Sequence, residues 1–179
     1  MKVFLVCGVI GAGKDFFFKN YKKDHPGERV VQLKFASVLR FLAGKIYNVD
    51  LSEEKSYEDW KACNREKLVY LGDYLKEAFG ENILAKGVTN QLKENCTYII
   101  TDFRFPIEFF SVAESVNLKD VTVVFMNFKS QRYCLKPEQT TERMACWLAS
   151  QGFEDKKEWD YWHFEKVMKR YQDSLLSTK

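Results

Sequence analysis

The chain has 179 residues, of which 46% are hydrophobic and 30% are charged, and its aromatic residues number 15 Phe, 9 Tyr and 4 Trp. This composition predicts one domain, residues 1–179, with its own hydrophobic core, and it excludes collagen-like, linker-like and disordered chains. The formal net charge of +3 is too small to indicate a nucleic-acid partner.

The cysteines argue against disulfides and against a cysteine-based metal site. Their number is odd and no two lie within four residues of each other: they are Cys7, Cys63, Cys96, Cys134 and Cys146. We interpret most of them as small apolar side chains in a reducing compartment. The apolar run at residues 3–7 is too short for a signal peptide or a membrane span, so we expect a cytoplasmic protein without a membrane segment.

Apolar runs and helical periodicities alternate along the first two thirds of the chain. Buried strands are predicted at residues 3–7, 30–33, 98–101 and 121–126. Helices are predicted at residues 14–23, 38–47 (capped by Ser37), from about Ser56 or Tyr57 to Phe79, 83–92 and 107–116 (with Pro106 in the first turn). In the long helix, Leu68, Leu71, Leu75 and Phe79 mark the expected core face. Strands separated by helices of this length predict a parallel α/β sheet.

The segment between the first strand and the first helix fits the phosphate-binding pattern G-x-x-x-x-G-K. Glycines let backbone N–H groups point at phosphate oxygens, the following helix adds a positive end, and Lys14 can reach the β- and γ-phosphates. The alternative is an ordinary turn with a solvated lysine. The predicted phosphate-binding residues are Gly8, Gly11, Ala12, Gly13, Lys14 and Asp15.

Asp15 stands where this pattern usually has Ser or Thr, whose hydroxyl touches Mg²⁺. A carboxylate can bind Mg²⁺ directly or through water. It can also simply cap the helix, and the sequence leaves both interpretations open.

The triplet Gly13-Lys14-Asp15 resembles the deoxynucleoside monophosphate kinases of large phages and related viruses, and also the animal-type phosphomevalonate kinases. Segments 33–40, 65–73 with 79–86, and 102–108 extend the resemblance over residues 1–126. The resemblance implies a three-layer α/β/α P-loop fold like that of adenylate kinase, with a helical acceptor-binding region at residues 35–95. It implies transfer of the ATP γ-phosphoryl group to a nucleoside monophosphate, Mg²⁺ as cofactor, and the cytoplasm of a cell or of an infected host cell.

The resemblance and the sheet topology together assign candidate roles. Arg40, Arg65 and Arg104 offer guanidinium groups for the acceptor phosphate, unless the first two are only surface charges. Asp102 ends a buried strand, where a carboxylate can hold the acceptor, hold Mg²⁺ through water, or merely cap the strand end. Glu108 either orients Arg104 or is a first-turn helix charge.

The segment 127–143 takes the place of a lid, which closes over ATP and excludes water. Its candidate cations are Arg132, Lys136 and Arg143, and the alternative is a solvated basic loop. The predicted catalytic residues are Lys14, Arg104 and Arg132.

The leading hypothesis is therefore a nucleoside or deoxynucleoside monophosphate kinase whose partners are ATP and the monophosphate. A phosphomevalonate kinase is the nearest enzymatic alternative, and a non-catalytic ATP-binding module is the alternative of another class. A nucleic-acid partner is not expected from the charge, and a homodimer stays open.

Overall fold

The computed structural model describes residues 1–8, 11–117, 120–126, 157–159 and 170. In this part of the chain a single sheet has the strand order β2-β3-β1-β4-β5. The first four strands in that order are parallel, and β5 runs antiparallel to β4 at the edge. The bounds are β1 Lys2–Gly8, β2 Val30–Leu33, β3 Thr97–Ile100, β4 Val121–Met126 and β5 Lys157–Trp159.

The predicted α/β class and the parallel sheet are confirmed, whereas an adenylate-kinase-like arrangement stays a prediction. The predicted strands at 30–33 and 121–126 coincide with β2 and β4. The edge strand β5 was not predicted, because its three residues carry no apolar alternation.

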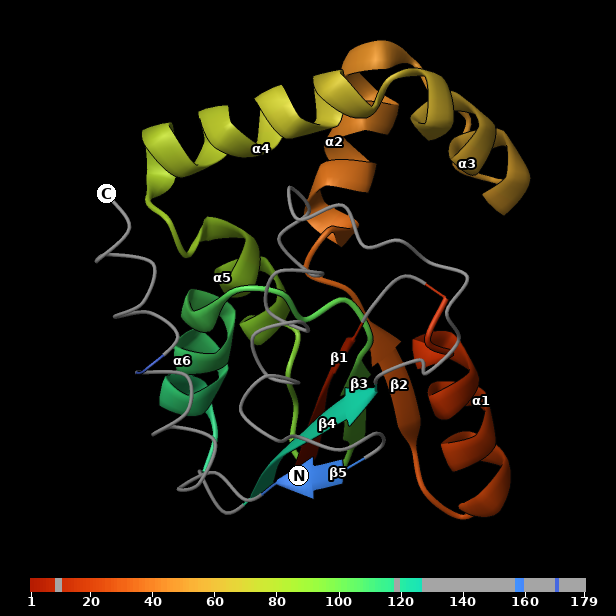
Figure 1. Ribbon diagram of the computed structural model, residues 1–179, viewed down its shortest axis with the longest axis vertical. Helices are drawn as coiled ribbons and strands as arrows, with labels where there is room; N and C mark the ends of the chain where they lie inside the picture. Colours follow the sequence, from red (N-terminus) through yellow and green to blue (C-terminus); the bar gives the residue numbers. More distant parts are fainter. Residues whose placement is uncertain (9–10, 118–119, 127–156, 160–169, 171–179) are drawn as a thin grey trace.

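The sheet carries the core because its central strand is buried along almost its whole length. Residues Val3 to Gly8 of β1 are buried between β3 and β4. On one face Phe4 meets Phe17 and Tyr21 of α1 (Lys14–Asp24), with ring centroids 6.1 and 4.9 Å away. Figure 1 shows α1 on one side of the sheet and α5 (Ile83–Thr89) with α6 (Pro106–Ser115) on the other.

Three further helices form a lobe beyond the carboxyl ends of the parallel strands (Figure 1). They are α2 (Ser37–Tyr47), α3 (Glu54–Cys63) and α4 (Arg65–Phe79). The long helix predicted up to Phe79 is in fact two helices, and the first begins earlier, at Glu54. Asn64 interrupts them with non-helical backbone angles and donates its side-chain amide to the Trp60 carbonyl at 2.8 Å. Ser37 is the first residue of α2 and not its cap, since Ala36 precedes the helix.

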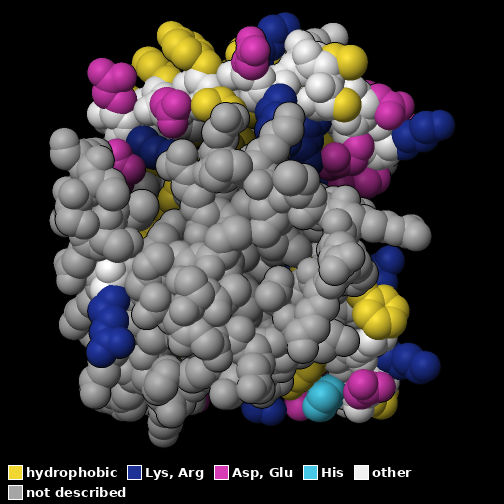
Figure 2. Space-filling model, in the orientation of Figure 1, with side chains coloured by type: hydrophobic (Ala, Val, Ile, Leu, Met, Phe, Trp, Pro, Cys, Tyr) yellow, Lys and Arg dark blue, Asp and Glu magenta, His cyan; other side chains and the backbone are white. Residues whose placement is uncertain are grey.

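Only some of the α4 side chains predicted to face the core are buried. Leu71 and Leu75 are buried, as predicted, but Phe79 is 62% exposed because the helix ends at Gly80, beyond the core. The outer side of the lobe carries hydrophobic side chains (Figure 2). The exposed ones on α2 and α4 include Phe41, Ile46, Val69, Tyr70 and Tyr74.

Three cysteines fall within the described residues, and all are free thiols: Cys7 and Cys96 are buried and Cys63 is exposed. Burial raises the pKa of the Cys7 thiol to about 12, although Lys14 opposes this. The two buried thiols fit the predicted role of apolar fillers, and Cys134 and Cys146 lie outside the described residues. Within those residues, no helix combines the length and the apolar character that crossing a membrane requires.

We predict that Gly8→Ala destabilises the fold strongly. A Cβ atom at Gly8 would lie 1.9 Å from the Met126 carbonyl oxygen, which is backbone of a paired strand and cannot move aside. The free energy of unfolding from urea titration should fall by about 3 kcal/mol or more. Gly27→Ala is the matched control: its Cβ meets nothing within 4 Å, and its effect should stay within about 0.5 kcal/mol. Equal stability of the two variants would contradict the β1–β4 packing.

Candidate phosphate-binding site

The loop after β1 has the backbone form that a phosphate cradle needs. Gly8, Gly11 and Gly13 have φ values of 148°, 81° and 87°, a region that side chains with a Cβ rarely adopt. Gly13 immediately precedes α1, so the amino end of that helix faces the loop. Residues 9–10, in the middle of the loop, lie outside the described residues. The described part of the loop therefore fits the predicted pattern.

Lys14 folds back over this loop. Its Nζ donates a hydrogen bond to the carbonyl oxygen of Gly8, six positions earlier in the chain, at 2.9 Å. The ammonium group thus lies against the loop backbone and not in bulk solvent. An anion bound in the loop would meet it there. The predicted contact of Lys14 with the β- and γ-phosphates stays a prediction.

Asp15 is held by groups in or just after the strands β2 and β3. Its Oδ1 accepts hydrogen bonds from Gln32 Nε2, at the side of β2, and from Thr101 Oγ1, just after β3, at 3.2 Å. Lys34 Nζ lies 3.4 Å from the same oxygen. Gln32 also donates to Thr101 at 2.9 Å, so the groups form one network. Gly13, and not Asp15, occupies the cap position of α1.

This network favours the ionised form of Asp15. Partial burial pushes the pKa of the Asp15 carboxyl upward, but Lys34 and the hydrogen bonds from Gln32 and Thr101 outweigh it, so the pKa lies below its ordinary value. Asp15 is therefore a carboxylate at neutral pH, balanced by the Lys34 ammonium.

Asp102 ties two loops together at the carboxyl end of β3. Its Oδ1 accepts the backbone N–H of Phe35 at 2.8 Å, and its Oδ2 accepts that of Ala36 at 2.9 Å. Burial raises the pKa of Asp102, although the two N–H donors and the charges of Arg104 and Lys34 oppose this. The geometry thus fits a structural tie that fixes the start of α2. The predicted roles of Asp102 toward Mg²⁺ and acceptor stay predictions.

Glu108 is buried at the first turn of α6 and fixes the turn that precedes it. Its Oε2 accepts the backbone N–H groups of Arg104 at 2.7 Å and Phe105 at 3.0 Å. Burial, and then the charge of Asp102, raise the pKa of Glu108 to about 8, against the opposing effect of these N–H donors and of the Arg104 charge. Glu108 therefore positions Arg104 through its backbone.

The three predicted acceptor arginines occupy different surroundings. Arg40 forms an ion pair with Glu54 and lies over the Tyr57 ring, 4.6 Å from its centroid, so α3 holds it. Arg65 is exposed at the first residue of α4, and Arg104 is exposed just beyond β3. Arg132, Lys136 and Arg143 lie outside the described residues.

Sequence reasoning assigned no role to Gln32, Lys34 or Thr101. A usable signal existed for the last two, because Lys34 directly follows the predicted strand at 30–33 and Thr101 is the last residue of the one predicted at 98–101, and ligand crevices form at such strand ends. Gln32 gave no such signal, since it lies inside β2.

Asp15 offers oxygen donors of the kind that Mg²⁺ prefers. Magnesium in nucleotide sites usually takes one or two carboxylates together with phosphate oxygens and water. Within the described residues, no three His, Cys, Asp or Glu side chains converge as a self-sufficient metal site. Asp15 therefore fits Mg²⁺ only as one ligand shared with phosphates, and the Lys34 ammonium beside its Oδ1 would compete with the ion.

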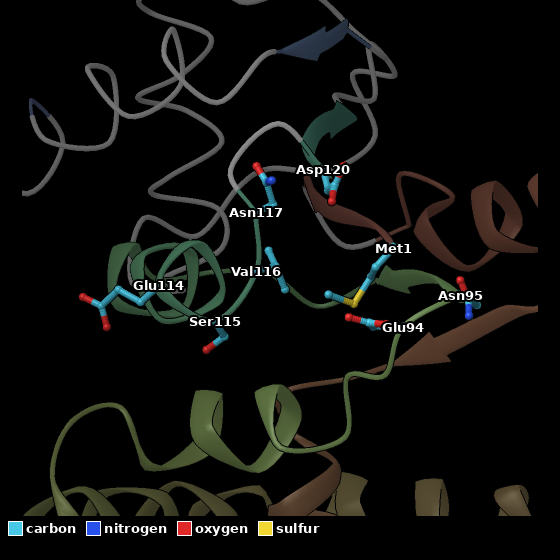
Figure 3. Close-up of a pocket in the computed structure, with 8 residues that line it drawn as sticks. All are labelled: Met1, Glu94, Asn95, Glu114, Ser115, Val116, Asn117 and Asp120. Atoms are coloured by element: carbon cyan, nitrogen blue, oxygen red, sulfur yellow. The ribbon is translucent and has the colours of Figure 1, made fainter.

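A cavity of about 510 Å³ lies at the opposite, amino-terminal ends of the strands. Its lining residues include Met1, Glu94, Asn95, Glu114 and Asp120, and their side chains are spread apart (Figure 3). Its acidic side chains disfavour phosphate, and the amino ends of parallel strands are not where ligands of open α/β sheets bind. We therefore place the candidate site at the loop after β1.

No known protein-family model matches the chain, and no curated protein sequence matches it.

We predict that Glu108→Gln makes the unfolding free energy less dependent on pH. Because the folded-state pKa is raised, the folded protein retains this proton between about pH 4.5 and about pH 8 while the unfolded chain loses it. Wild-type stability should therefore fall as the pH rises through this window. Gln keeps an oxygen for the two N–H donors but has no proton to lose, so the slope should be shallower.

The measurement is urea unfolding at several pH values across the window. The exposed Glu81→Gln serves as the control and should keep the wild-type slope. Glu108→Ala should be less stable at every pH, because it leaves the two N–H groups without their acceptor. An identical slope for wild type and Glu108→Gln would refute the raised pKa.

Proposed function

We propose that the chain is an ATP-dependent kinase that transfers the γ-phosphoryl group to the phosphate of a nucleoside or deoxynucleoside monophosphate, which gives the diphosphate. One observation carries the proposal: the Lys14 ammonium is held over a loop of positive-φ glycines at the carboxyl end of the central strand. The Gly13-Lys14-Asp15 triplet and the Asp102-Phe103-Arg104 segment support the monophosphate kinase among P-loop enzymes.

Phosphoryl transfer needs mainly positioned positive charge, because the migrating group spreads its charge over three equatorial oxygens. The loop N–H groups and the amino end of α1 bind the phosphates of ATP, and Lys14 follows the γ-phosphoryl group. Asp15 would hold a Mg²⁺ ion that arrives with the nucleotide, and the ion would supply positive charge at the phosphate oxygens. No general base is required, because the acceptor phosphate is already an anion.

The acceptor occupies the region under the helical lobe, residues 35–95. Arg65 and Arg104 are exposed toward solvent and suit the two-pronged binding of a phosphate. Arg40 contributes only after it leaves Glu54 and the Tyr57 ring. Asp102 and Glu108 fix the backbone of the turns on which this region rests. In the proposed single kinase domain, residues 127–143 supply the lid, with Arg132, Lys136 and Arg143.

One observation favours a second candidate, a module that binds ATP without turnover. The Lys34 ammonium lies beside Asp15, where a catalytic Mg²⁺ would have to compete with it. Phosphomevalonate kinase, the nearest enzymatic alternative, shares both the Gly-Lys-Asp triplet and the Asp-x-Arg pattern of residues 102–104, so only the acceptor distinguishes the two enzymes.

A panel of acceptors separates these candidates. ADP formation from ATP and Mg²⁺ is followed with each nucleoside and deoxynucleoside monophosphate, and in parallel with phosphomevalonate. Turnover with a monophosphate supports the proposal, and turnover with phosphomevalonate alone replaces it. ATP binding without turnover of any acceptor favours the module.

We predict that Lys14→Met lowers kcat by at least about 100-fold, because the charge that follows the migrating phosphoryl group is lost. Lys23→Met, at the exposed far end of α1, is the matched control and should keep wild-type kcat. Circular dichroism and the melting temperature check that both variants fold. Full turnover by the Lys14 variant would contradict the assigned site.

A further inference from the structure

We propose that Lys34 is a second lysine of the phosphate site: Asp15 holds it in the free protein, and a phosphate group of the ligand binds it when the site fills. This rests on the proposed function, since it names a further residue of the same site. The ligand chemistry is a phosphate ester anion, either the terminal phosphate of ATP or the phosphate of the acceptor.

The sheet brings Lys34 to the loop. Leu33 pairs with Ile100, so Lys34 and Thr101 leave the sheet at the same level at the carboxyl edge. Both reach Asp15: Lys34 Nζ lies 3.4 Å from Oδ1, and Thr101 Oγ1 lies 3.2 Å from it. Asp15 directly follows Lys14 in the chain, so the Lys34–Asp15 pair lies next to the residue whose ammonium group contacts the loop.

Asp15 is a fixed partner, whereas Lys34 is a movable one. Thr101 is 3% exposed and Gln32 is half-buried, and together they orient the carboxylate. The Lys34 side chain is 45% exposed, and a pair of this exposure contributes no more than about 1 kcal/mol to stability. Lys34 can therefore leave Asp15 at small cost.

A phosphate group is a better partner for Lys34 than Asp15. It carries more negative charge than a carboxylate and has three acceptor oxygens, and the Lys ammonium has three donors. Burial raises the pKa of Asp102, and the Lys34 charge is among the influences that oppose this, so the charge of Lys34 also reaches the residue that follows β3. Its departure would leave Asp15 open to the Mg²⁺ that accompanies the nucleotide.

The test compares Lys34→Gln with wild type, using Lys23→Gln as the matched exposed control. Calorimetric titration with ATP and with inorganic tripolyphosphate, in buffers with and without Mg²⁺, measures the nucleotide-side phosphates. Steady-state kinetics at saturating ATP measures the KM for the monophosphate. Lys34→Arg keeps the charge and should retain most of the binding. The melting temperature of Lys34→Gln should stay close to that of wild type, because the lost pair is exposed.

We expect Lys34→Gln to weaken one phosphate interaction about tenfold, the loss of one charge-assisted contact. A higher Kd for ATP and tripolyphosphate assigns Lys34 to the nucleotide. A higher KM for the monophosphate with an unchanged ATP Kd assigns it to the acceptor. The proposal is overturned if the Kd for ATP and tripolyphosphate and the KM for the monophosphate all stay within about twofold of wild type. It is also overturned if Lys23→Gln has an equal effect.

Failure of the Lys34 proposal can be distinguished from failure of the proposed kinase function. If wild type turns over no acceptor but binds tripolyphosphate, the kinase proposal fails, and the tripolyphosphate Kd of Lys34→Gln alone decides the role of Lys34. An unchanged Kd in that case overturns it. If wild type binds neither tripolyphosphate nor ATP, no phosphate site exists and both proposals fail.

Discussion

The parallel alignment of β2, β3 and β1 is the constraint on which the site depends. Because the strands run in the same direction, each delivers the segment that follows it to the same edge of the sheet. Lys34 follows β2, Thr101 and Asp102 follow β3, and the glycine loop follows β1. These segments are far apart in sequence, yet groups in or just after β2 and β3 bind Asp15 at the start of α1, and Asp102 binds the backbone that follows β2. The loop itself requires Gly8, because β4 runs directly beside it.

The carboxyl groups at this edge have two different roles, and the extent of their burial distinguishes the two. Asp102 is half-buried and Glu108 is buried; burial raises the pKa of both, and their oxygens accept backbone N–H groups. Such carboxylates set the shape of the turns, because an unsatisfied buried N–H is costly. Asp15 is exposed, has a lowered pKa and meets a lysine. It is therefore the carboxylate that can exchange partners when a charged ligand arrives.

The sequence predicted the elements whose pattern is local. Buried apolar runs gave β1 to β4 to within a residue or two, and the glycine pattern located the loop. The break at Asn64 was missed because the periodicity of apolar residues continues across it from α3 to α4. The edge strand β5 was missed because three residues are too few to show a pattern.

The site was less predictable, since its contacts join residues far apart in the chain. Lys14 and Asp15 were identified from the motif, but the network around Asp15 depends on the register of β2 against β3, which no local pattern encodes. Glu108 was expected to pair with Arg104 or to be a helix charge, and the structure shows that it binds the backbone of Arg104. Arg40 was expected to bind the acceptor, which stays a prediction. Its ion pair with Glu54 could not be predicted, because it depends on how α3 packs against α2.

The central claim is that phosphate binds at the carboxyl edge of the sheet. Backbone amide chemical shifts, recorded while Mg²⁺ and ATP are added to the full chain, test it most directly. We expect the largest changes on residues 8–15 and on Lys34 and Thr101, with little change around Met1, Glu94 and Asp120. Changes concentrated at those last residues, around the acidic cavity at the other end of the strands, would contradict it.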